Sequence, residues 1–328
     1  MPWRQLHDPD NPENGNAGNG GDLGKHTVYL AVLDYLLARS PWSTELRVRE
    51  CHAGRGMYRI PVGNIRRPLL DCLYNPVGAD VAVLLHDVQR ASQSALTVWP
   101  AALADFEWYS GSAVVNAWRL GTAQAGRHQL ELYELAAETR AVLRAVFAAP
   151  GLQLSRVGVR ILPEPEDHGD FDGELHIERS IAAWNAQDLV LLDPFAMWRQ
   201  AHDQPRRNRY RRIVERLIAR GEESPSLLLF WTWGRAFPVA DGDLDDTNDR
   251  VGNGYQELRD LLHQANRHFI RVTWRWGLQF AMWVIVPTPH LEALSAAIQL
   301  RCDELRDHLL RRGCGGRLAN PDIQVVVD

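Results

Sequence analysis

The chain has 328 residues, a hydrophobic fraction of 45% and a net charge of −5. This length fits one large domain or two small ones, and the apolar fraction is sufficient for a buried core. The mild negative charge argues against a protein that coats nucleic acid, although it leaves room for a local basic surface. No run of about 18 apolar residues predicts a membrane span. The Asn- and Gly-rich segment 1–21 lacks the apolar core of a secretory signal, so we expect a cytoplasmic protein with no membrane partner.

The periodicity of apolar residues predicts alternating strands and helices, which is typical of a doubly wound α/β sheet. The predicted strands are residues 45–50, 128–135, 157–162, 188–194, 226–233, 268–276 and 278–287. The predicted helices are residues 25–39, 136–147, 206–220, 255–266 and 289–312. We therefore expect a seven-stranded, mostly parallel sheet whose last two strands form an antiparallel hairpin at one edge.

Residues 62–106 interrupt this alternation with two helical stretches and predict a small helical insertion. The rest of the chain shows no internal repeat. We expect one domain over residues 1–328, with a polar N-terminal segment over residues 1–24.

Cysteine and lysine usage bear on metal and cofactor sites. The four cysteines form no close CxxC pair, so the sequence predicts neither a zinc site nor a disulfide framework, and we expect no metal. Of the 36 basic residues, only Lys25 is a lysine. A planar guanidinium does not replace a compact ammonium at a tight site, which marks Lys25 as a candidate functional residue. The alternative is a chance survivor in an arginine-rich composition.

Polar residues follow the predicted strands, where ligands bind in open α/β sheets. Glu50 ends the first strand and leads into a loop with Gly54 and Gly56, where glycine lets the backbone approach a ligand closely. This loop lacks the full GxGxxG pattern, which argues against NAD. Glu134 follows the second strand, where a carboxylate can accept hydrogen bonds from ribose hydroxyls or serve only as a helix N-terminal acid. Asp193 follows the fourth strand.

Several motifs follow one another along the chain: Ala17-Gly18-Asn19-x-x-Asp22-x-x-Lys25-His26-Thr27, His52-Ala53-Gly54-x-Gly56-x-Tyr58, Tyr109-Ser110-Gly111-Ser112, Glu134-Leu135, Asp172-Gly173 and Asp193-Pro194. Together they resemble motifs of the J-type adenine methyltransferases of large-subunit ribosomal RNA. The resemblance spans nearly the whole chain. It implies a Rossmann-like class I methyltransferase fold and S-adenosylmethionine as the cofactor.

The same resemblance implies that S-adenosylmethionine is contacted by His26, His52, Ser112, Glu134, Asp172, Gly173 and Asp193. Lys25 lies within the first of these motifs, and the loop after the first strand adds Glu50, Gly54 and Gly56 as expected cofactor contacts. Asp170 is the alternative to Asp172, because that loop is aligned by spacing alone. Asp193 is the expected catalytic residue, which would orient or deprotonate the methyl acceptor.

The chain differs from that family at the residues that would contact the methyl acceptor. Phe195 and Ala196 stand where the family has Pro-Tyr, whose aromatic ring stacks on a flipped adenine. The Tyr and His that precede the family's first motif are also missing. We therefore expect a different acceptor, and the candidates that line its pocket are Asn14, Tyr58, Phe195 and Trp198.

Three functions remain open at this point. The first is a methyltransferase that acts on a nitrogen or oxygen of a small molecule, and the second is a methyltransferase of adenine in RNA. The third is a non-catalytic protein that binds S-adenosylmethionine. The arginine-rich stretch 206–212 would grip phosphates in the second case, or else form a solvated helix face that pairs with Glu215 and other acids. The oligomeric state is open.

Overall fold

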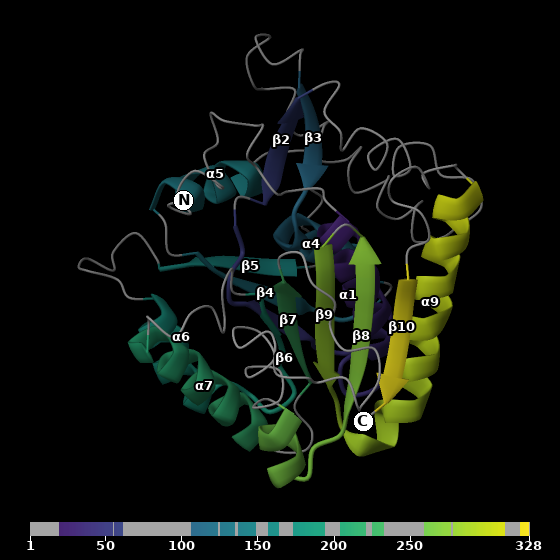
Figure 1. Ribbon diagram of the computed structural model, residues 1–328. Helices are drawn as coiled ribbons and strands as arrows, with labels where there is room; N and C mark the ends of the chain where they lie inside the picture. The colour runs from purple at the N-terminus through teal and green to yellow at the C-terminus, as the bar shows by residue number, and fades with distance from the viewer. Residues whose placement is uncertain are drawn as a thin grey trace.

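The computed structural model describes residues 20–54, 56–61, 106–123, 125–134, 137–148, 157–163, 173–193, 204–220, 225–232, 259–276, 278–311 and 322–327. These residues form an eight-stranded sheet with helices on both faces, and a separate two-stranded sheet (Figure 1). Among them, no helix is both long and apolar enough to cross a bilayer.

The eight-stranded sheet has a parallel part and an antiparallel part. Its strands are β1 (Arg47–Glu50), β4 (His128–Tyr133), β5 (Val157–Leu162), β6 (Leu189–Leu192), β7 (Ser226–Thr232), β8 (Phe269–Trp276), β9 (Leu278–Ile285) and β10 (Asp322–Val327). Their order is β10-β8-β9-β7-β6-β1-β4-β5. Neighbours from β5 to β7 are parallel, whereas β9 runs antiparallel to both β7 and β8. The chain goes from β1 to β4 and β5 on one side and returns to β6 on the other, so the topological switch point lies between β1 and β6.

All seven predicted strands are present, but the prediction of a seven-stranded sheet was wrong. β10 adds an eighth strand and pairs antiparallel with β8, with Val325 opposite Val272. The β8–β9 hairpin therefore lies inside the sheet and not at its edge. The β-branched run at the end of β10 fits the pleated surface of a strand, and β10 follows the last predicted helix.

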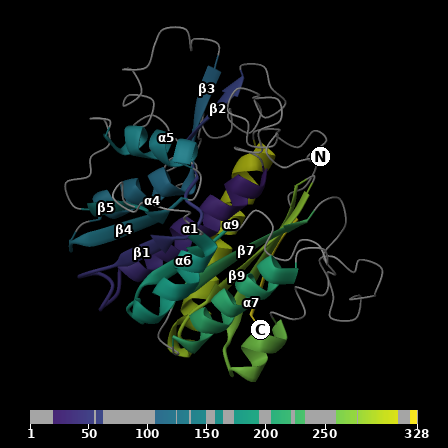
Figure 2. The same cartoon turned by 90° about the vertical axis from the view of Figure 1, so that its left-hand side faces the viewer.

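Helices cover both faces of the sheet. They are α1 (Gly20–Leu37), α4 (Ser112–Gly121), α5 (Ala137–Ala148), α6 (Gly173–Ser180), α7 (Gln204–Ala219) and α9 (Leu291–Arg311), with short 3₁₀ turns η4 (Ile181–Ala183) and η5 (Thr288–His290). α1, α4, α5 and α9 share one apolar core with the sheet, and α6 and α7 pack against the other face. Figure 2 shows α6 and α7 on the side of the sheet opposite α1 and α9.

Other differences from the predicted elements concern the segments between strands. α4 and α6 were not expected, and β2 (Met57–Pro61) pairs antiparallel with β3 (Phe106–Ser110) in the small second sheet. The predicted helical insertion lies outside the described residues, except that Phe106 begins β3. α1 starts at Gly20, before the predicted start at residue 25 and inside the polar N-terminal segment 1–24. The single-domain organisation stays a prediction.

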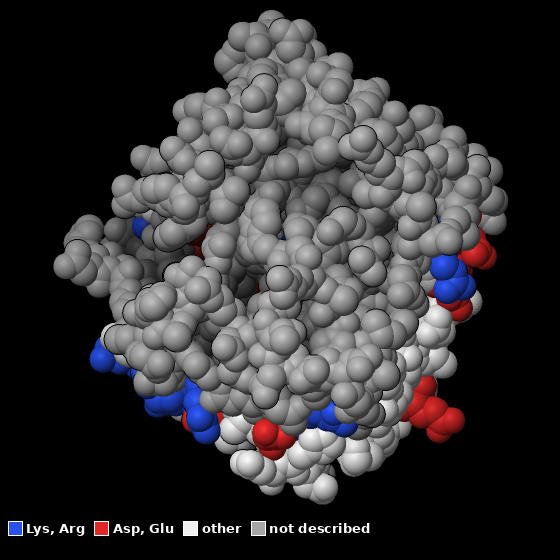
Figure 3. Space-filling model, viewed as in Figure 1, with Lys and Arg blue, Asp and Glu red and all other residues white. Residues whose placement is uncertain are grey.

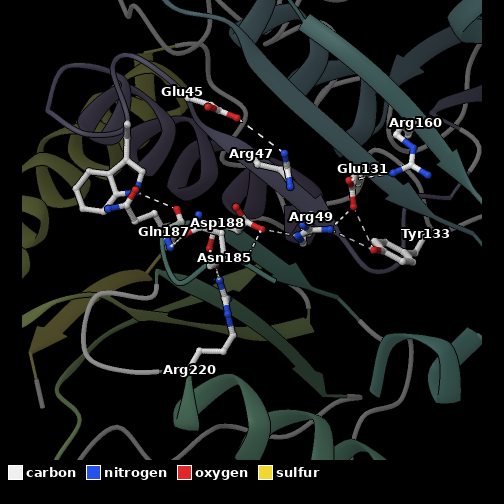
Figure 4. A network of polar contacts seen from close by, with 11 residues as sticks. Glu45, Arg47, Arg49, Glu131, Tyr133, Arg160, Asn185, Gln187, Asp188 and Arg220 are labelled. Atoms are coloured by element: carbon white, nitrogen blue, oxygen red, sulfur yellow. Dashed lines mark hydrogen bonds and ion pairs between the residues drawn. The ribbon is translucent and has the colours of Figure 1, made fainter. Parts of the chain in front are cut away.

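A buried charge network on the α6–α7 face joins β1 and β4 to Asp188, the residue before β6 (Figure 4). Arg49 of β1 donates through Nε to Asp188 Oδ2 over 2.6 Å and forms a second ion pair with Glu131 of β4. The Tyr133 hydroxyl donates to Glu131 Oε2 over 3.3 Å. Arg220 NH2 donates to the backbone oxygen of Asp188 over 3.0 Å, and burial lowers the pKa of Arg220 to about 10. Each carboxylate in this network is thus paired, as buried charges require.

Candidate functional site

The loop after β1 is bound to two neighbouring elements. Gly54 and Gly56 have φ values of +64° and +74°, a backbone conformation that favours glycine. The Gly54 N–H donates to Glu134 Oε2 over 2.9 Å, which ties the loop to the end of β4. The Gly111 N–H donates to the Gly56 oxygen over 2.7 Å and ties the same loop to the start of α4. The loop therefore has a defined shape at the carboxyl end of β1.

Glu50, the last residue of β1, is completely buried beneath this loop. The Ser112 hydroxyl donates to its Oε1, and Asn116 Nδ2 donates to its Oε2 over 2.9 Å. Ser112 and Asn116 are four residues apart on α4 and so share one helix face. Burial raises the pKa of Glu50 to about 8, while the Ser112 hydrogen bond and the charge of Lys25 act in the opposite direction. Burial thus favours the protonated form of Glu50.

Lys25 and Asp193 form an ion pair at the switch point. Lys25 lies in α1, Asp193 follows β6 directly, and 2.8 Å separates Nζ from Oδ2. Their side chains are 11% and 17% exposed, so the pair is largely shielded from water. In the register of β1 and β6, Glu50 lies opposite Leu191, two residues before Asp193. Both charges of the pair act on Glu50. The positive charge of Lys25 lowers the pKa of Glu50, and the negative charge of Asp193 raises it.

Other predicted residues lie on α1, in the loop after β1, on α6 and on β2. His26 is buried in α1, and His52 is half-buried in the loop after β1. Gly173 begins α6, and Tyr58 lies on β2 opposite Tyr109. The remaining candidates lie outside the described residues; they are Asn14, Asp170, Asp172, Phe195 and Trp198.

Three acids therefore stand at the carboxyl ends of three adjacent strands, β4, β1 and β6. Glu134, Glu50 and Asp193 occupy these positions. Their oxygens suit a ligand that carries positive charge and hydroxyl groups. In the described part of the chain, no group of three His, Cys, Asp or Glu residues could hold a metal ion.

Asn116 and Tyr29 are site residues that were not predicted from the sequence. Asn116 Nδ2 donates to the Tyr29 hydroxyl over 2.5 Å as well as to Glu50. The signal that could have revealed Asn116 is its four-residue spacing from Ser112, which only matters once α4 is known to be a helix.

The basic stretch on α7 is charge-paired where its side chains are described. Arg211 Nε lies 2.8 Å from Glu215 Oε1, and Arg212 and Arg216 both pair with Glu178 of α6. The Glu178 hydrogen bond raises the pKa of Arg212. In Figure 3, basic side chains line the lower left of this face, over α6 and α7, with acidic side chains beside them. For these three arginines, pairing with acids is the better description than a free phosphate-binding surface.

Comparison with known proteins gives structural likenesses alone. No family model and no curated protein matches the chain. The crystal structure of protein LPL1258 from Legionella pneumophila str. Philadelphia 1, described as family DUF519, aligns with a TM-score of 0.59 at 13% identity, over 95% of this chain and 98% of that one. A putative O-methyltransferase from Klebsiella pneumoniae aligns with a TM-score of 0.36 at 12% identity, over 87% of this chain and 90% of that one. The first likeness shows a shared fold, and neither transfers an activity to this chain.

Proposed function

We propose that this protein transfers a methyl group from S-adenosylmethionine to a nitrogen or oxygen atom of a small molecule. The observation that carries the proposal is the row of Glu134, Glu50 and Asp193 at the ends of three adjacent parallel strands. The loop that follows Glu50 has two glycines in the left-handed region, and its Gly54 N–H donates to Glu134. The mainly parallel sheet with an antiparallel hairpin supports it too, because this is the plan expected of class I methyltransferases.

The residues present fit S-adenosylmethionine. Its ribose offers two hydroxyls, and its amino and sulfonium groups are cationic, so the carboxylates of Glu134 and Asp193 are complementary to it. Glu134, already turned toward the loop by the Gly54 N–H, would accept hydrogen bonds from the ribose. When bound, this cofactor supplies a methyl group that is already activated, so the protein mainly has to align the acceptor.

Asp193 is the residue proposed to act on the acceptor. Lys25 holds its Oδ2 and so fixes the direction of the carboxylate at the switch point. A carboxylate held in this way can accept a hydrogen bond from the acceptor's N–H or O–H group and take its proton. The Phe195-Ala196 departure and the paired arginines of α7 favour a small acceptor over an adenine in RNA.

Calorimetric binding of S-adenosylhomocysteine tests the cofactor site. Glu134→Gln should weaken binding about 10- to 100-fold, because a hydrogen bond to a charged group contributes about 1.5–3 kcal/mol. Glu45→Gln is the matched control, because Glu45 is exposed before β1 and should leave affinity unchanged. If neither S-adenosylhomocysteine nor S-adenosylmethionine binds the wild-type protein, the proposal is wrong.

A labelled-methyl assay tests the acceptor class. RNA, DNA and a small-metabolite extract are compared side by side with the same labelled S-adenosylmethionine. Transfer to the metabolite extract, lost in Asp193→Asn, is the expected result. Transfer to RNA with a steep salt dependence would instead identify a nucleic-acid methyltransferase. Tight cofactor binding without transfer to any fraction would favour a non-catalytic binding protein.

A further inference from the structure

Asn116 is a buried polar residue on an otherwise mostly apolar helix face. It is completely buried, together with Ala113, Val114, Ala117 and Leu120 of α4. Its Oδ1 atom is also buried and has no hydrogen-bond partner among the described residues. An unpaired buried acceptor lowers stability, and the hydrogen bonds of the amide nitrogen on the same side chain offset that cost. Such local violations of packing rules are expected at functional sites.

The amide nitrogen of Asn116 makes hydrogen bonds to two other buried side chains. Nδ2 donates to Glu50 Oε2 over 2.9 Å and to the Tyr29 hydroxyl over 2.5 Å. Ser112, one turn earlier on α4, donates to the other oxygen of Glu50. Each carboxyl oxygen of Glu50 therefore accepts one hydrogen bond from α4. The Tyr29 hydroxyl of α1 accepts a further hydrogen bond from the Asn116 amide and so helps to orient it.

We propose that Asn116, backed by Tyr29, is a positioning residue that holds Glu50 and lets this buried carboxyl release its proton when a cationic ligand enters the site. The inference rests on the proposed function and extends it to the regulation of cofactor binding by pH. Asn116 does not touch the ligand in this account. It acts through Glu50, because an N–H donor favours the ionised carboxylate over the neutral acid.

Several charged or titratable groups face Glu50 in the described part of the chain. They are Lys25 and Tyr29 on α1, Asp193 after β6, and Cys51, the next residue. Lys25 is the cation in this set, and it is already paired with Asp193. Two neutral donors, Ser112 and Asn116, are therefore the direct contacts that stabilise negative charge on Glu50.

The direction of the pH dependence follows from the protonation of Glu50. Burial raises its pKa to about 8, so the unliganded group carries a proton at pH 7. A cation bound nearby favours the carboxylate, and binding then releases that proton. Affinity for S-adenosylmethionine should therefore rise with pH, by up to about tenfold per unit below pH 8, because one proton is exchanged.

Calorimetric titration with S-adenosylmethionine at pH 6 and pH 7, in two buffers of different ionisation enthalpy, tests this coupling. The wild-type protein should bind several-fold more tightly at pH 7 and release close to one proton. Asn116→Ala should bind about tenfold more weakly at pH 7 and shift the rise in affinity to higher pH. Asn116→Asp, which has nearly the same shape, should bind more weakly still, because its carboxylate repels a charged Glu50. A purely structural role would instead make Asn116→Asp the milder variant, and that result would overturn the proposal.

Two tyrosines of α1 provide a matched pair of variants that preserve the fold. Tyr29→Phe should move the pH profile of binding in the same direction as Asn116→Ala, by a smaller amount. Tyr35→Phe removes a hydroxyl from the same helix, where it bonds His290 Nδ1 over 3.1 Å, and should leave the profile unchanged. Identical profiles for Tyr29→Phe and Tyr35→Phe would contradict the inference.

Unfolding without ligand separates this inference from the proposed function. Glu50 has a folded-state pKa of about 8 against 4.5 as its ordinary value, so the wild-type protein should lose stability relative to Glu50→Gln as pH rises from 5 to 8. If the stabilities of the wild-type protein and of Glu50→Gln depend on pH in the same way, Glu50 holds no proton to release and the inference is wrong. Cofactor binding that is independent of pH and of Asn116 overturns the inference and leaves the proposed function intact. No cofactor binding at any pH overturns the proposed function, and the inference with it.

Discussion

Lys25 and Asp193 lie 168 residues apart in the sequence, yet their side chains meet with 2.8 Å between Nζ and Oδ2. The pair connects the first helix, α1, to the end of β6 at the switch point of the sheet. It also gives the single lysine of the chain a defined partner. The compact ammonium suits a largely buried single contact, whereas a guanidinium would need room for its planar fork.

Breaking this ion pair should destabilise the protein. Lys25→Met leaves a largely buried carboxylate without a counter-charge, and we expect a loss of about 2 kcal/mol in the free energy of unfolding. Urea denaturation of Lys25→Met, Asp193→Asn and the double variant gives the coupling energy. A coupling energy near zero would show that the pair behaves like an exposed one. Lys25→Arg should recover part of the loss because it keeps the charge.

Gly56 should not tolerate a side chain. Its φ is +74°, and a Cβ atom there would lie 2.8 Å from Leu143 Cδ1 on α5. We expect Gly56→Ala to lower the free energy of unfolding by about 1–3 kcal/mol, through backbone strain and displacement of Leu143. Gly158→Ala is the control, since a Cβ on that β5 residue meets nothing within 4 Å. Equal stabilities of the two variants in thermal denaturation would contradict this account.

Arg49 should be among the most sensitive charged positions in the fold. Arg49→Met removes the buried cation that Glu131 and Asp188 share, and Arg160, a second ion-pair partner of Glu131, is largely exposed, so the free energy of unfolding should fall by about 3–5 kcal/mol. Arg211→Met removes an exposed i,i+4 pair with Glu215 and should change stability by less than about 1 kcal/mol. Chemical denaturation of both variants checks the contrast. Similar losses would mean that the network contributes no more than a surface pair.

His128 should make the protein less stable in mild acid. Its Nδ1 accepts a hydrogen bond from the Leu46 N–H over 3.1 Å, so the ring must be neutral, and burial lowers its pKa. The unfolded chain therefore takes up a proton before the folded one, and stability falls as pH drops below about 6.5. His128→Asn keeps an acceptor but does not titrate, so its stability should fall less between pH 7 and pH 5. An unchanged pH dependence would exclude His128 as the cause.

Much of the sheet could be predicted because its strands have local signatures. The apolar run Leu189–Leu192 is typical of a strand buried on both faces, and β6 occupies it. α4 escaped prediction because Val114 and Val115 are β-branched and weaken its helical signal. β10 was not predicted because its position in the sheet depends on pairing with β8, and the local sequence does not specify that pairing.

In the candidate site, too, some residues could be predicted from the sequence and others could not. Glu50, Glu134 and Asp193 could be proposed because each follows a strand, and their order along the chain is visible in the sequence. The contact between Tyr29 and Asn116 joins residues 87 positions apart on two helices, one of which was not expected. Only the packing of α1 against α4 reveals that contact.

The central place of β1 has a consequence for how the chain reaches this structure. β1 comes first among the strands, but its partners arrive late, since 82 and 139 residues separate Arg49 from Glu131 and Asp188. Closing such long loops before any pairing is gained makes folding slow. During synthesis, β1 can pair only after the later strands β4 and β6 have been made. Pulsed hydrogen exchange during refolding should therefore find the amides of β1 protected no earlier than those of β4 and β6.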